Sequence, residues 1–314
     1  MTEQVALFGP ADPELRIVED LVAKSIAGDP PEVALPLAEL FAAGGKRIRP
    51  ALVVLAAMCG TYDRDRTMPA AMAVEVTHAA TLVHDDVIDR SPTRRGRPSV
   101  AAALGDEPAI VIGDFYFAKA YELAALTNTP EVVSILAKAV MEICAGEVRQ
   151  QSIRYRYSTS VDEYMHRIEA KTATLLAACC DIGALLGGLD DAKRTSLRTY
   201  GRLLGLAFQI ADDVLDYVGT EGEVGKPIGH DILEGFATLP VMLASIDLED
   251  DRRLSEHEAR EIVEAVRNSN GPQQALDQAR DHAEAARSQL KGIGGGEAAS
   301  ALSALAGYVV SRKL

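Results

Sequence analysis

Two short acidic motifs are the residues most suited to chemistry in this chain. Residues 85–89 have the sequence DDVID and residues 212–216 have the sequence DDVLD. On a helix the first and last aspartates of each motif share a face, because they are four residues apart. Carboxylates this close repel one another unless cations neutralise them. The motifs therefore predict two metal-binding faces, made by Asp85, Asp86, Asp89, Asp212, Asp213 and Asp216.

Mg²⁺ suits such faces because it takes one or two carboxylates, keeps several waters and completes its octahedron with phosphate oxygens. Two faces could hold a diphosphate through shared metal ions and stabilise its departure as a leaving group. One DDxxD motif alone is equally explained by a solvated helix end. An aspartate near a helix C-terminus is electrostatically unfavourable, however, and two copies that each close an apolar helix favour metal binding.

Basic segments supply the positive charge that a diphosphate site requires. Residues 44–50 (GGKRIRP) place three cations within four positions, which is more than a helix C-terminus needs. Residues 93–98 (TRRGRP) lie just beyond the first acidic motif, where arginine forks could meet phosphate oxygens. Each segment alone also fits an ordinary helix cap or loop. Further polar candidates, in helical runs or in a Gly-rich loop, are Lys171, Thr172, Gln209 and Lys226.

Helices must position these groups. Apolar residues recur at three-and-four spacing in segment after segment, and strand-like alternation is rare. Glycine and proline fall between the segments, and no linker divides the chain. We expect an all-α protein with roughly ten or more helices in a single domain over residues 1–314. The acidic motifs should end two long helices, over residues 68–90 and 197–217.

The amino-acid composition limits the possible binding partners and the cellular compartment of the protein. A formal net charge of -14 argues against nucleic acid, because phosphate backbones need a basic face. The N-terminus has no secretory signal, and no apolar run is long enough to span a bilayer. The cysteines form no CxxC pair, so we expect small buried thiols in a reducing cytoplasm. These cysteines are Cys59, Cys144, Cys179 and Cys180.

The motifs together resemble the trans-isoprenyl diphosphate synthases, or polyprenyl synthetases, of the medium- and long-chain type. The similarity extends from GGKRIRP at Gly44 to ALAGYVVSR, which ends at Arg312. Between them lie HAATLVHDDVIDRSPTRRGRPS, AIVIGDFYFA, AGEVRQ, EAKTATL, AFQIADDVLDYVG and GKPIGHDILEGFATLP. Several motifs in family order make the resemblance specific. It implies a helical bundle of the isoprenoid synthase type with a central cavity.

The resemblance also implies roles for single residues. Three Mg²⁺ ions would bind together with diphosphate. Their main ligands would be Asp85, Asp89 and Asp212, with Asp216, Asp86 and Asp213 assisting directly or through water. Isopentenyl diphosphate would be held by Lys46, Arg49, His78 and Arg95. The allylic diphosphate would be held by Arg94, Lys171, Thr172, Gln209 and Lys226.

The implied reaction is a head-to-tail, all-trans condensation. The allylic substrate loses diphosphate, the double bond of isopentenyl diphosphate attacks the resulting cation, and the departed diphosphate takes the proton. Water must be excluded, since it would quench the cation. Members are commonly homodimers, and release of a very apolar product calls for transient contact with a membrane.

The residues below the first acidic motif bear on product length. Ala80 and Thr81 lie one turn before Asp85, and Val76 and Thr77 lie one turn further. None is bulky, whereas short-chain members often carry an aromatic floor there. Each helical turn adds about 5.4 Å, close to one isoprene unit, so we expect a medium- to long-chain product. Tight helix packing explains the same small residues.

Several alternatives stay open. Many family members carry a lysine where this chain has Phe236, which leaves room for an inactive regulatory subunit of a heteromeric synthase. A short-chain synthase is a second alternative. A class I terpene cyclase would share the fold but usually lacks an intact second DDxxD. A di-iron bundle would use Glu75-x-x-His78 and Glu163-x-x-His166 and would leave the acidic motifs unexplained.

Overall fold

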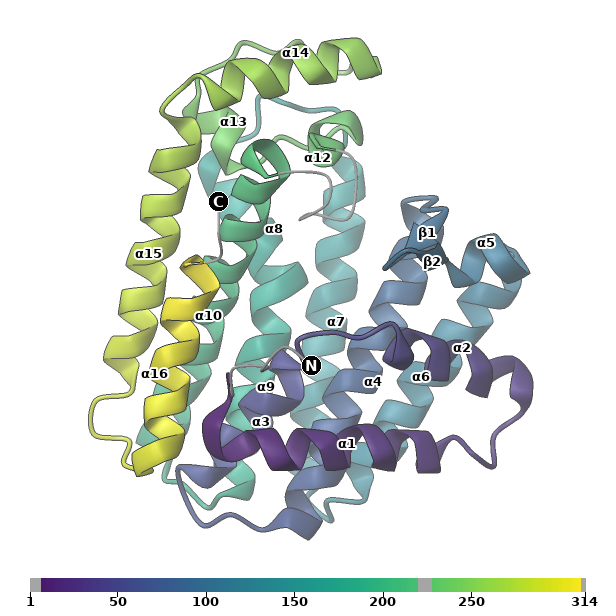
Figure 1. Ribbon diagram of the computed structural model, residues 1–314, viewed down its shortest axis with the longest axis vertical. Helices are drawn as coiled ribbons and strands as arrows, with labels where there is room; N and C mark the ends of the chain where they lie inside the picture. Colours follow the sequence, from purple (N-terminus) through teal and green to yellow (C-terminus); the bar gives the residue numbers. More distant parts are fainter. Residues whose placement is uncertain (1–6, 220–227, 312–314) are drawn as a thin grey trace, which may run out of the picture. The chain divides into compact units, whose positions relative to one another are not determined.

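A computed structural model describes residues 7–219 and 228–311 of the chain. Its helices are numbered along the sequence (Figure 1). Those before the centre of the chain are η1 Gly9–Ala11, α1 Asp12–Ser25, α2 Pro31–Ala42, α3 Ile48–Met58, α4 Arg64–Ile88, α5 Val100–Leu104, α6 Asp106–Ala125 and α7 Pro130–Ser152. The rest are α8 Val161–Ile168, the π-helix η2 Glu169–Ala173, α9 Thr174–Leu186, α10 Asp191–Val218, α12 His230–Leu233, α13 Leu239–Leu243, α14 Glu256–Arg267, α15 Gly271–Gln289 and α16 Gly296–Val310.

Two compact units make up the chain. Unit 1 consists of residues 1–140, 178–198 and 292–302, and unit 2 consists of residues 141–177, 199–291 and 303–314. The helices α7, α9, α10 and α16 contribute residues to both units. The first acidic motif belongs to unit 1 and the second to unit 2. The single domain expected from the sequence stays a prediction.

Unit 1 is built around α3 and α4. Residues 51–57 of α3 are fully buried. Two glycines of the following chain allow the backbone of α3 to come close. An added Cβ atom on Gly183 would lie 2.2 Å from the carbonyl oxygen of Val53. An added Cβ atom on Gly187 would lie 2.6 Å from the carbonyl oxygen of Ala57. The helix α4 begins at an Asp63 cap and packs along α6 (Figure 1). These contacts fix the helix that carries the first acidic motif.

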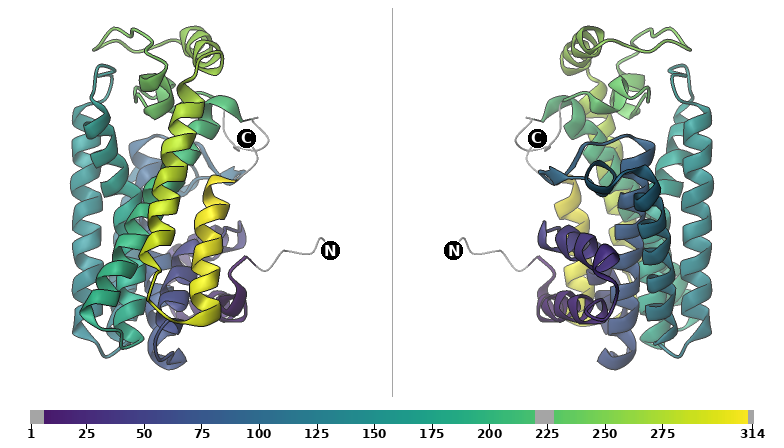
Figure 2. Two further views of the ribbon diagram at one scale, coloured as in Figure 1. Left: turned by 90° about the vertical axis from the view of Figure 1, so that its left-hand side faces the viewer. Right: turned by 90° about the vertical axis from the view of Figure 1, so that its right-hand side faces the viewer.

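Unit 2 has its own apolar core. Leu206, Ile210 and Val214 of α10 pack against Tyr164 and Ile168 of α8. A capping box between Ser255 and Glu258 starts α14, and α15 follows as one long helix that packs against α13 (Figures 1 and 2). The helix that carries the second acidic motif is therefore held along an apolar face.

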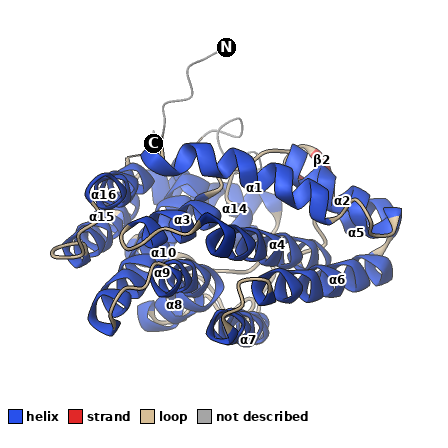
Figure 3. Cartoon of the chain, turned by 90° about the horizontal axis from the view of Figure 1, so that it is seen from below, coloured by secondary structure: helices blue, strands red, loops and turns tan. Residues whose placement is uncertain are grey.

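Helices form almost all the regular structure of the described residues, which confirms the all-α prediction (Figure 3). The strands found there are β1 (Thr93–Arg94) and β2 (Arg97–Pro98), an antiparallel pair in which Arg94 lies opposite Arg97. This short hairpin carries the basic segment that follows the first acidic motif. Among the described residues, we find no helix of the length and apolarity that crossing a bilayer requires.

The expectation that every cysteine is buried is wrong at one position. Cys59, Cys179 and Cys180 are buried, whereas Cys144 is exposed on α7. Burial raises the pKa of the Cys59 thiol to about 11. An apolar run does not imply burial of each member, because a helix always turns one side away from its core.

Candidate active site

The first acidic motif lies at the C-terminal end of α4, where Asp89 is the C-cap residue. Asp85 and Asp89 are partly exposed, whereas Asp86 is 1% exposed. The Nε atom of Arg94, in strand β1, donates to Asp86 at 2.9 Å. Burial raises the pKa of Asp86, and the charge and hydrogen bond of Arg94 oppose that rise. The motif thus turns one carboxylate into the protein and keeps two at the surface.

His84 anchors this end of α4 to α6. Its Nε2 atom lies 3.0 Å from the carbonyl oxygen of Ile110 and its ring packs against Phe117. An added Cβ atom on Gly113 would lie 2.2 Å from that Nε2 atom, so only glycine leaves room for the imidazole. The AIVIGDFYFA segment therefore positions the first acidic motif, a role that the sequence did not reveal.

A cluster of cations surrounds His78 in unit 1. Burial, followed by the charges of Arg49, Arg95, Arg94 and Arg47, lowers the pKa of His78 well below its ordinary value. The imidazole is therefore neutral at physiological pH. The structure thus brings together the residues predicted to hold isopentenyl diphosphate: Lys46 is exposed next to this cluster in the chain, and Arg49, His78 and Arg95 belong to it.

Arg47 organises this cluster, a role that the sequence motif did not reveal. It is 8% exposed and adopts a left-handed backbone conformation, with φ of 51°. Its guanidinium donates to Glu19 and Glu75, both at 2.8 Å, and lies over the ring of Phe41. Removing one partner of such a buried pair is strongly destabilising. Arg47 consequently fixes the loop that carries Lys46 and begins the helix that carries Arg49.

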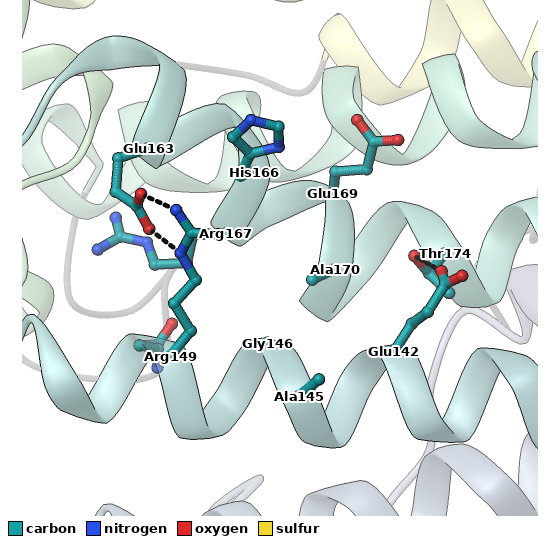
Figure 4. A pocket seen from close by; sticks show the side chains of 11 residues that line it. Glu142, Ala145, Gly146, Arg149, Glu163, His166, Arg167, Glu169, Ala170 and Thr174 are labelled. Atoms are coloured by element: carbon teal, nitrogen blue, oxygen red, sulfur yellow. Dashed lines mark hydrogen bonds and ion pairs between the residues drawn. The ribbon is translucent and has the colours of Figure 1, made fainter.

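Both Glu-x-x-His pairs of the di-iron hypothesis have other partners. Glu75 accepts from Arg47, and His78 lies among arginines, whose charge repels a metal ion. Glu163 accepts a hydrogen bond from Arg149 at 2.7 Å. Both residues line a pocket of about 340 Å³ between α7 and α8 (Figure 4). Neither pair is arranged as a metal site.

The second acidic motif lies near the end of α10 and is also divided between interior and surface. Asp212 is partly exposed, whereas Asp213 is buried and accepts the Tyr164 hydroxyl at 2.7 Å and the Gln209 amide at 2.8 Å. Burial, together with the charge of Asp231, raises the pKa of Asp213 to about 7. Asp216 is buried as well, and its Oδ2 atom accepts the backbone N–H of Asp231 at 3.1 Å.

A π-helix, η2, carries Lys171 and Thr172. Thr172 donates to Gln209 at 2.7 Å, and Lys171 pairs with Glu147 at 3.0 Å. Glu147 lies in the AGEVRQ segment, which was noted in the sequence without a role for this residue. π-Helices are rare in proteins, and those that occur are frequently found at functional sites. Thr172 is thus linked through Gln209 to Asp213 of the second acidic motif, whereas Lys171 contacts Glu147 of α7.

Two glycines hold the π-helix between its neighbours. An added Cβ atom on Gly146 of α7 would lie 2.5 Å from the Cβ atom of Ala170. An added Cβ atom on Gly205 of α10 would lie 2.4 Å from the Cα atom of Ala173. Both contacts are too short for any larger residue, so glycine at these positions fixes the π-helix.

The predicted chain-length residues lie along α4. Val76, Thr77 and Ala80 are fully buried, and Thr81 is partly exposed with its hydroxyl donating to the His78 carbonyl at 2.8 Å. Burial fits a tunnel wall and tight helix packing equally well, so their role stays a prediction. Lys226 lies outside the described residues.

The two motifs follow one pattern. In each, the second aspartate is buried and bound by protein donors, while the first is partly exposed. Among the described residues, no group of three metal-ligating side chains is preassembled. Asp85, Asp89 and Asp212 offer partly exposed carboxylate oxygens, and Mg²⁺ binds through one or two carboxylates and completes its shell with water and phosphate. The oxygen donors present therefore fit Mg²⁺.

Comparison with known proteins identifies the family. Residues 30–279 match the sequence pattern of the polyprenyl synthetase family, which is more than half of the chain. The chain belongs to this family. Polyprenyl synthetases are prenyltransferases, so the enzyme predicted from the motifs is confirmed, and with it the all-α isoprenoid synthase fold.

Single relatives support the same conclusion. The chain is 40% identical over 242 residues to heptaprenyl diphosphate synthase component 2 of Geobacillus stearothermophilus, covering 77% of this chain and 76% of the relative. It is 42% identical over 210 residues to geranylgeranyl diphosphate synthase of Methanosarcina mazei, covering 65% of each. Among solved structures, a polyprenyl synthase from Caulobacter crescentus complexed with calcium and isoprenyl diphosphate has a TM-score of 0.91 at 39% identity, covering 97% of this chain and 96% of that one.

The glycine contact at the π-helix can be tested by adding one methyl group. Gly205→Ala should displace Ala173, destabilise the protein by about 1–3 kcal/mol and raise the KM for the allylic substrate, because Thr172 moves with it. Denaturant unfolding and steady-state kinetics measure both effects. Gly307→Ala is the matched control, since nothing lies within 4 Å of its added Cβ atom, and it should be neutral or stabilising. Equal behaviour of the two variants would contradict this role for Gly205.

Proposed function

We propose that this polyprenyl synthetase adds isopentenyl diphosphate to an allylic diphosphate in a Mg²⁺-dependent, all-trans condensation that yields a medium- or long-chain polyprenyl diphosphate. The main support for this proposal is that the two acidic motifs are arranged alike. In each motif the first aspartate is partly exposed, and the second is buried and accepts hydrogen bonds from the protein. We propose that residues 1–314 form a single domain. A cytoplasmic location stays a prediction.

Asp85, Asp89, Asp212 and Asp216 are the proposed Mg²⁺ ligands. Three bound Mg²⁺ ions would withdraw charge from the allylic diphosphate and so favour its departure. Asp86 and Asp213 act through the protein, since their carboxylates already accept hydrogen bonds from Arg94, Tyr164 and Gln209. They orient the aspartates beside them.

Binding of isopentenyl diphosphate is assigned to the cationic cluster of unit 1. Lys46, Arg49 and Arg95 supply positive charge, and neutral His78 supplies a hydrogen bond without adding to the repulsion among the arginines. The allylic diphosphate is assigned to Lys171, Thr172 and Gln209, with Arg94 and Lys226. The hydrogen bonds of Thr172 and Gln209 link these residues to the second acidic motif.

The proton lost after condensation is assigned to the departed diphosphate. His78 is a poor acceptor in its place, because burial and the charges of the surrounding arginines lower its pKa and disfavour the imidazolium. Buried carboxylates are likewise engaged by protein donors, as for Asp86 and Asp213. The described residues thus supply charge and shape while the substrate supplies its own base.

Two features bear on partners. The relative from Geobacillus stearothermophilus is named as one component of its synthase, which raises a heteromeric assembly as a second candidate. We propose a homodimer instead, because α5 and α6 of unit 1 present neighbouring exposed apolar residues. These are Leu104, Ile110 and Val111, of which Val111 is 66% exposed.

We also propose that the elongated, apolar product leaves the enzyme through transient contact with a membrane.

Loss of the first aspartate of either motif should abolish catalysis without unfolding the protein. We expect Asp85→Ala and Asp212→Ala each to lower turnover by about 100-fold or more, because each carboxylate would hold a metal ion that offsets the charge of the departing diphosphate. Turnover of an allylic diphosphate with isopentenyl diphosphate and Mg²⁺ measures this, and circular dichroism checks the fold. Asp277→Ala, at an exposed site on α15, is the control. Wild-type turnover in either motif variant would refute the metal assignment.

Product length tests the residues below the first acidic motif. Ala80→Phe should shorten the product, because a phenyl ring would close the space one turn below Asp85. Ala80 is fully buried, so Thr81→Phe, at a partly exposed position, provides a second variant that tolerates the larger ring. Chromatography of the hydrolysed products reports their length. Unshifted products from a folded, active Thr81→Phe enzyme would show that these residues do not form the wall.

The homodimer is tested by its mass in solution. Analytical ultracentrifugation of the purified chain should give twice the monomer mass, and Val111→Glu should shift the protein toward monomer because it places charge on the apolar patch. Val161→Glu, at an exposed valine of unit 2, should stay dimeric. A wild-type monomer that gains activity only with a second protein would establish the heteromeric alternative.

A further inference from the structure

The helix that carries the second acidic motif ends without a cation of its own. The helix α10 ends at Val218, and its last turn contains no basic residue. Asp213 and Asp216 lie near this end, where the helix dipole disfavours negative charge. The last four carbonyl groups of a helix also lack partners within that helix. This end of α10 therefore requires positive charge and hydrogen-bond donors from elsewhere.

Arg267, the last residue of α14, meets both requirements. Its Nε atom donates to the Tyr217 carbonyl, and its Nη2 atom donates to the Gly219 carbonyl at 3.2 Å. A guanidinium group suits two acceptors because its donors are fixed in one plane. A cation near a helix C-terminus also offsets the negative end of the dipole. Arg267 thus anchors the end of α10 from another helix of unit 2.

The same face of α14 also contacts Gly229, which precedes α12. Val263 lies one helical turn before Arg267 and so shares its face. Gly229 has a φ of 72°, and an added Cβ atom there would lie 2.4 Å from the Cγ2 atom of Val263. The N–H of Gly229 donates to the Asp216 carbonyl at 2.8 Å. Gly229 is therefore held between α14 and the backbone of the second acidic motif.

These contacts continue to the carboxylate of Asp216. The N–H of Asp231, in α12, donates to the Oδ2 atom of Asp216 at 3.1 Å. The helix α12 packs against α14 (Figure 1), and Ile232 of α12 shares a buried apolar cluster with Tyr217 and Val263. The side chain of Asp216 is therefore oriented by α12, and α12 is held by α14.

We propose that α14 positions the second acidic motif, with Arg267 anchoring the end of α10 and Val263 holding the segment that binds Asp216. Arg267 is a positioning residue, since it acts on the motif through backbone carbonyl groups. The inference rests on the proposed function, which assigns metal ions to Asp212 and Asp216. It extends that function to a helix that supplies none of the residues assigned to metal or substrate.

Amide hydrogen exchange in the metal-free protein tests the anchor. Arg267→Met should speed exchange over residues 213–219 by about tenfold, because the helix end loses hydrogen bonds to a charged group. Arg267→Lys should exchange at a rate between those of Arg267→Met and the wild type, since an ammonium group keeps the charge but cannot fork onto two carbonyls. Mass spectrometry of peptic fragments measures these rates. Wild-type exchange in Arg267→Met would overturn the proposal.

Arg260→Met is the matched control on the same helix. Arg260 is exposed and pairs with Glu256 of α14 itself at 3.2 Å. Its loss should leave the exchange of residues 213–219 at the wild-type rate. Equal acceleration in Arg260→Met and Arg267→Met would show that any loss of charge on α14 loosens the helix end, and the specific role of Arg267 would be refuted.

A second variant approaches the motif through the segment before α12. Gly229→Ala should also speed exchange over residues 213–219, because the added methyl group would displace Val263 and strain a left-handed backbone. The N–H of Gly229 would then leave the Asp216 carbonyl. A folded Gly229→Ala protein with wild-type exchange would show that this segment does not hold the motif, contrary to the proposal.

Kinetic constants show whether the anchor serves the proposed reaction. Arg267→Met should raise about tenfold both the KM for the allylic diphosphate and the Mg²⁺ concentration for half-maximal turnover, because the second acidic motif loses its fixed position. The KM for isopentenyl diphosphate should stay at the wild-type value, since its proposed residues belong to unit 1. A lower Mg²⁺ requirement would show that Arg267 repels the metal, and equal rises in both KM values would indicate a general loss of structure. Either result would contradict the inference.

Hydrogen exchange separates this inference from the proposed function, because it requires no turnover. If the wild-type enzyme condenses no prenyl substrate, the proposed function fails, while the exchange rates still decide whether α14 holds the motif. Conversely, an active wild-type enzyme whose Arg267→Met variant exchanges normally would keep the proposed function and remove the inference.

Discussion

Carboxylates repel one another near the C-terminal ends of two helices, α4 and α10, and much of the nearby packing counteracts that repulsion. Both acidic motifs lie where the helix dipole already disfavours negative charge. In each, the protein relieves one carboxylate by burying it among donors, Arg94 for Asp86, and Tyr164 with Gln209 for Asp213. The first aspartates are left partly exposed, where cations and substrate can reach them.

The surrounding packing serves to hold these carboxylates still. Gly113 lets His84 lock the end of α4 to α6, and Gly146 and Gly205 hold the π-helix in unit 2. The cations are fixed by the same means, because buried Arg47 ties the loop of Lys46 to Glu19 and Glu75. The charges that we propose for diphosphate binding are thus fixed by the fold itself, and such preorganisation avoids reorganisation during reaction.

The sequence predicted the helices, both acidic motifs and the family, because periodicity and motif order are local properties. It did not predict which aspartate of each motif is buried, since that depends on partners such as Tyr164, which lies 49 residues before Asp213. The role of Arg47, the π-helix and the exposure of Cys144 were missed for the same reason. Phe236 was recognised as a departure from the family pattern, but its contacts with Arg154 and Arg167 could not be predicted from the sequence.

We propose that Asp85 and Asp212 bind metal ions together with diphosphate. Electron paramagnetic resonance of Mn²⁺, used in place of Mg²⁺, tests this when bound ion is counted with and without inorganic diphosphate. We expect diphosphate to increase Mn²⁺ binding to the wild-type protein, and either Asp85→Ala or Asp212→Ala to abolish the increase. An increase that persists at half its size in each variant would mean that each motif binds metal by itself, and this result would overturn the proposal.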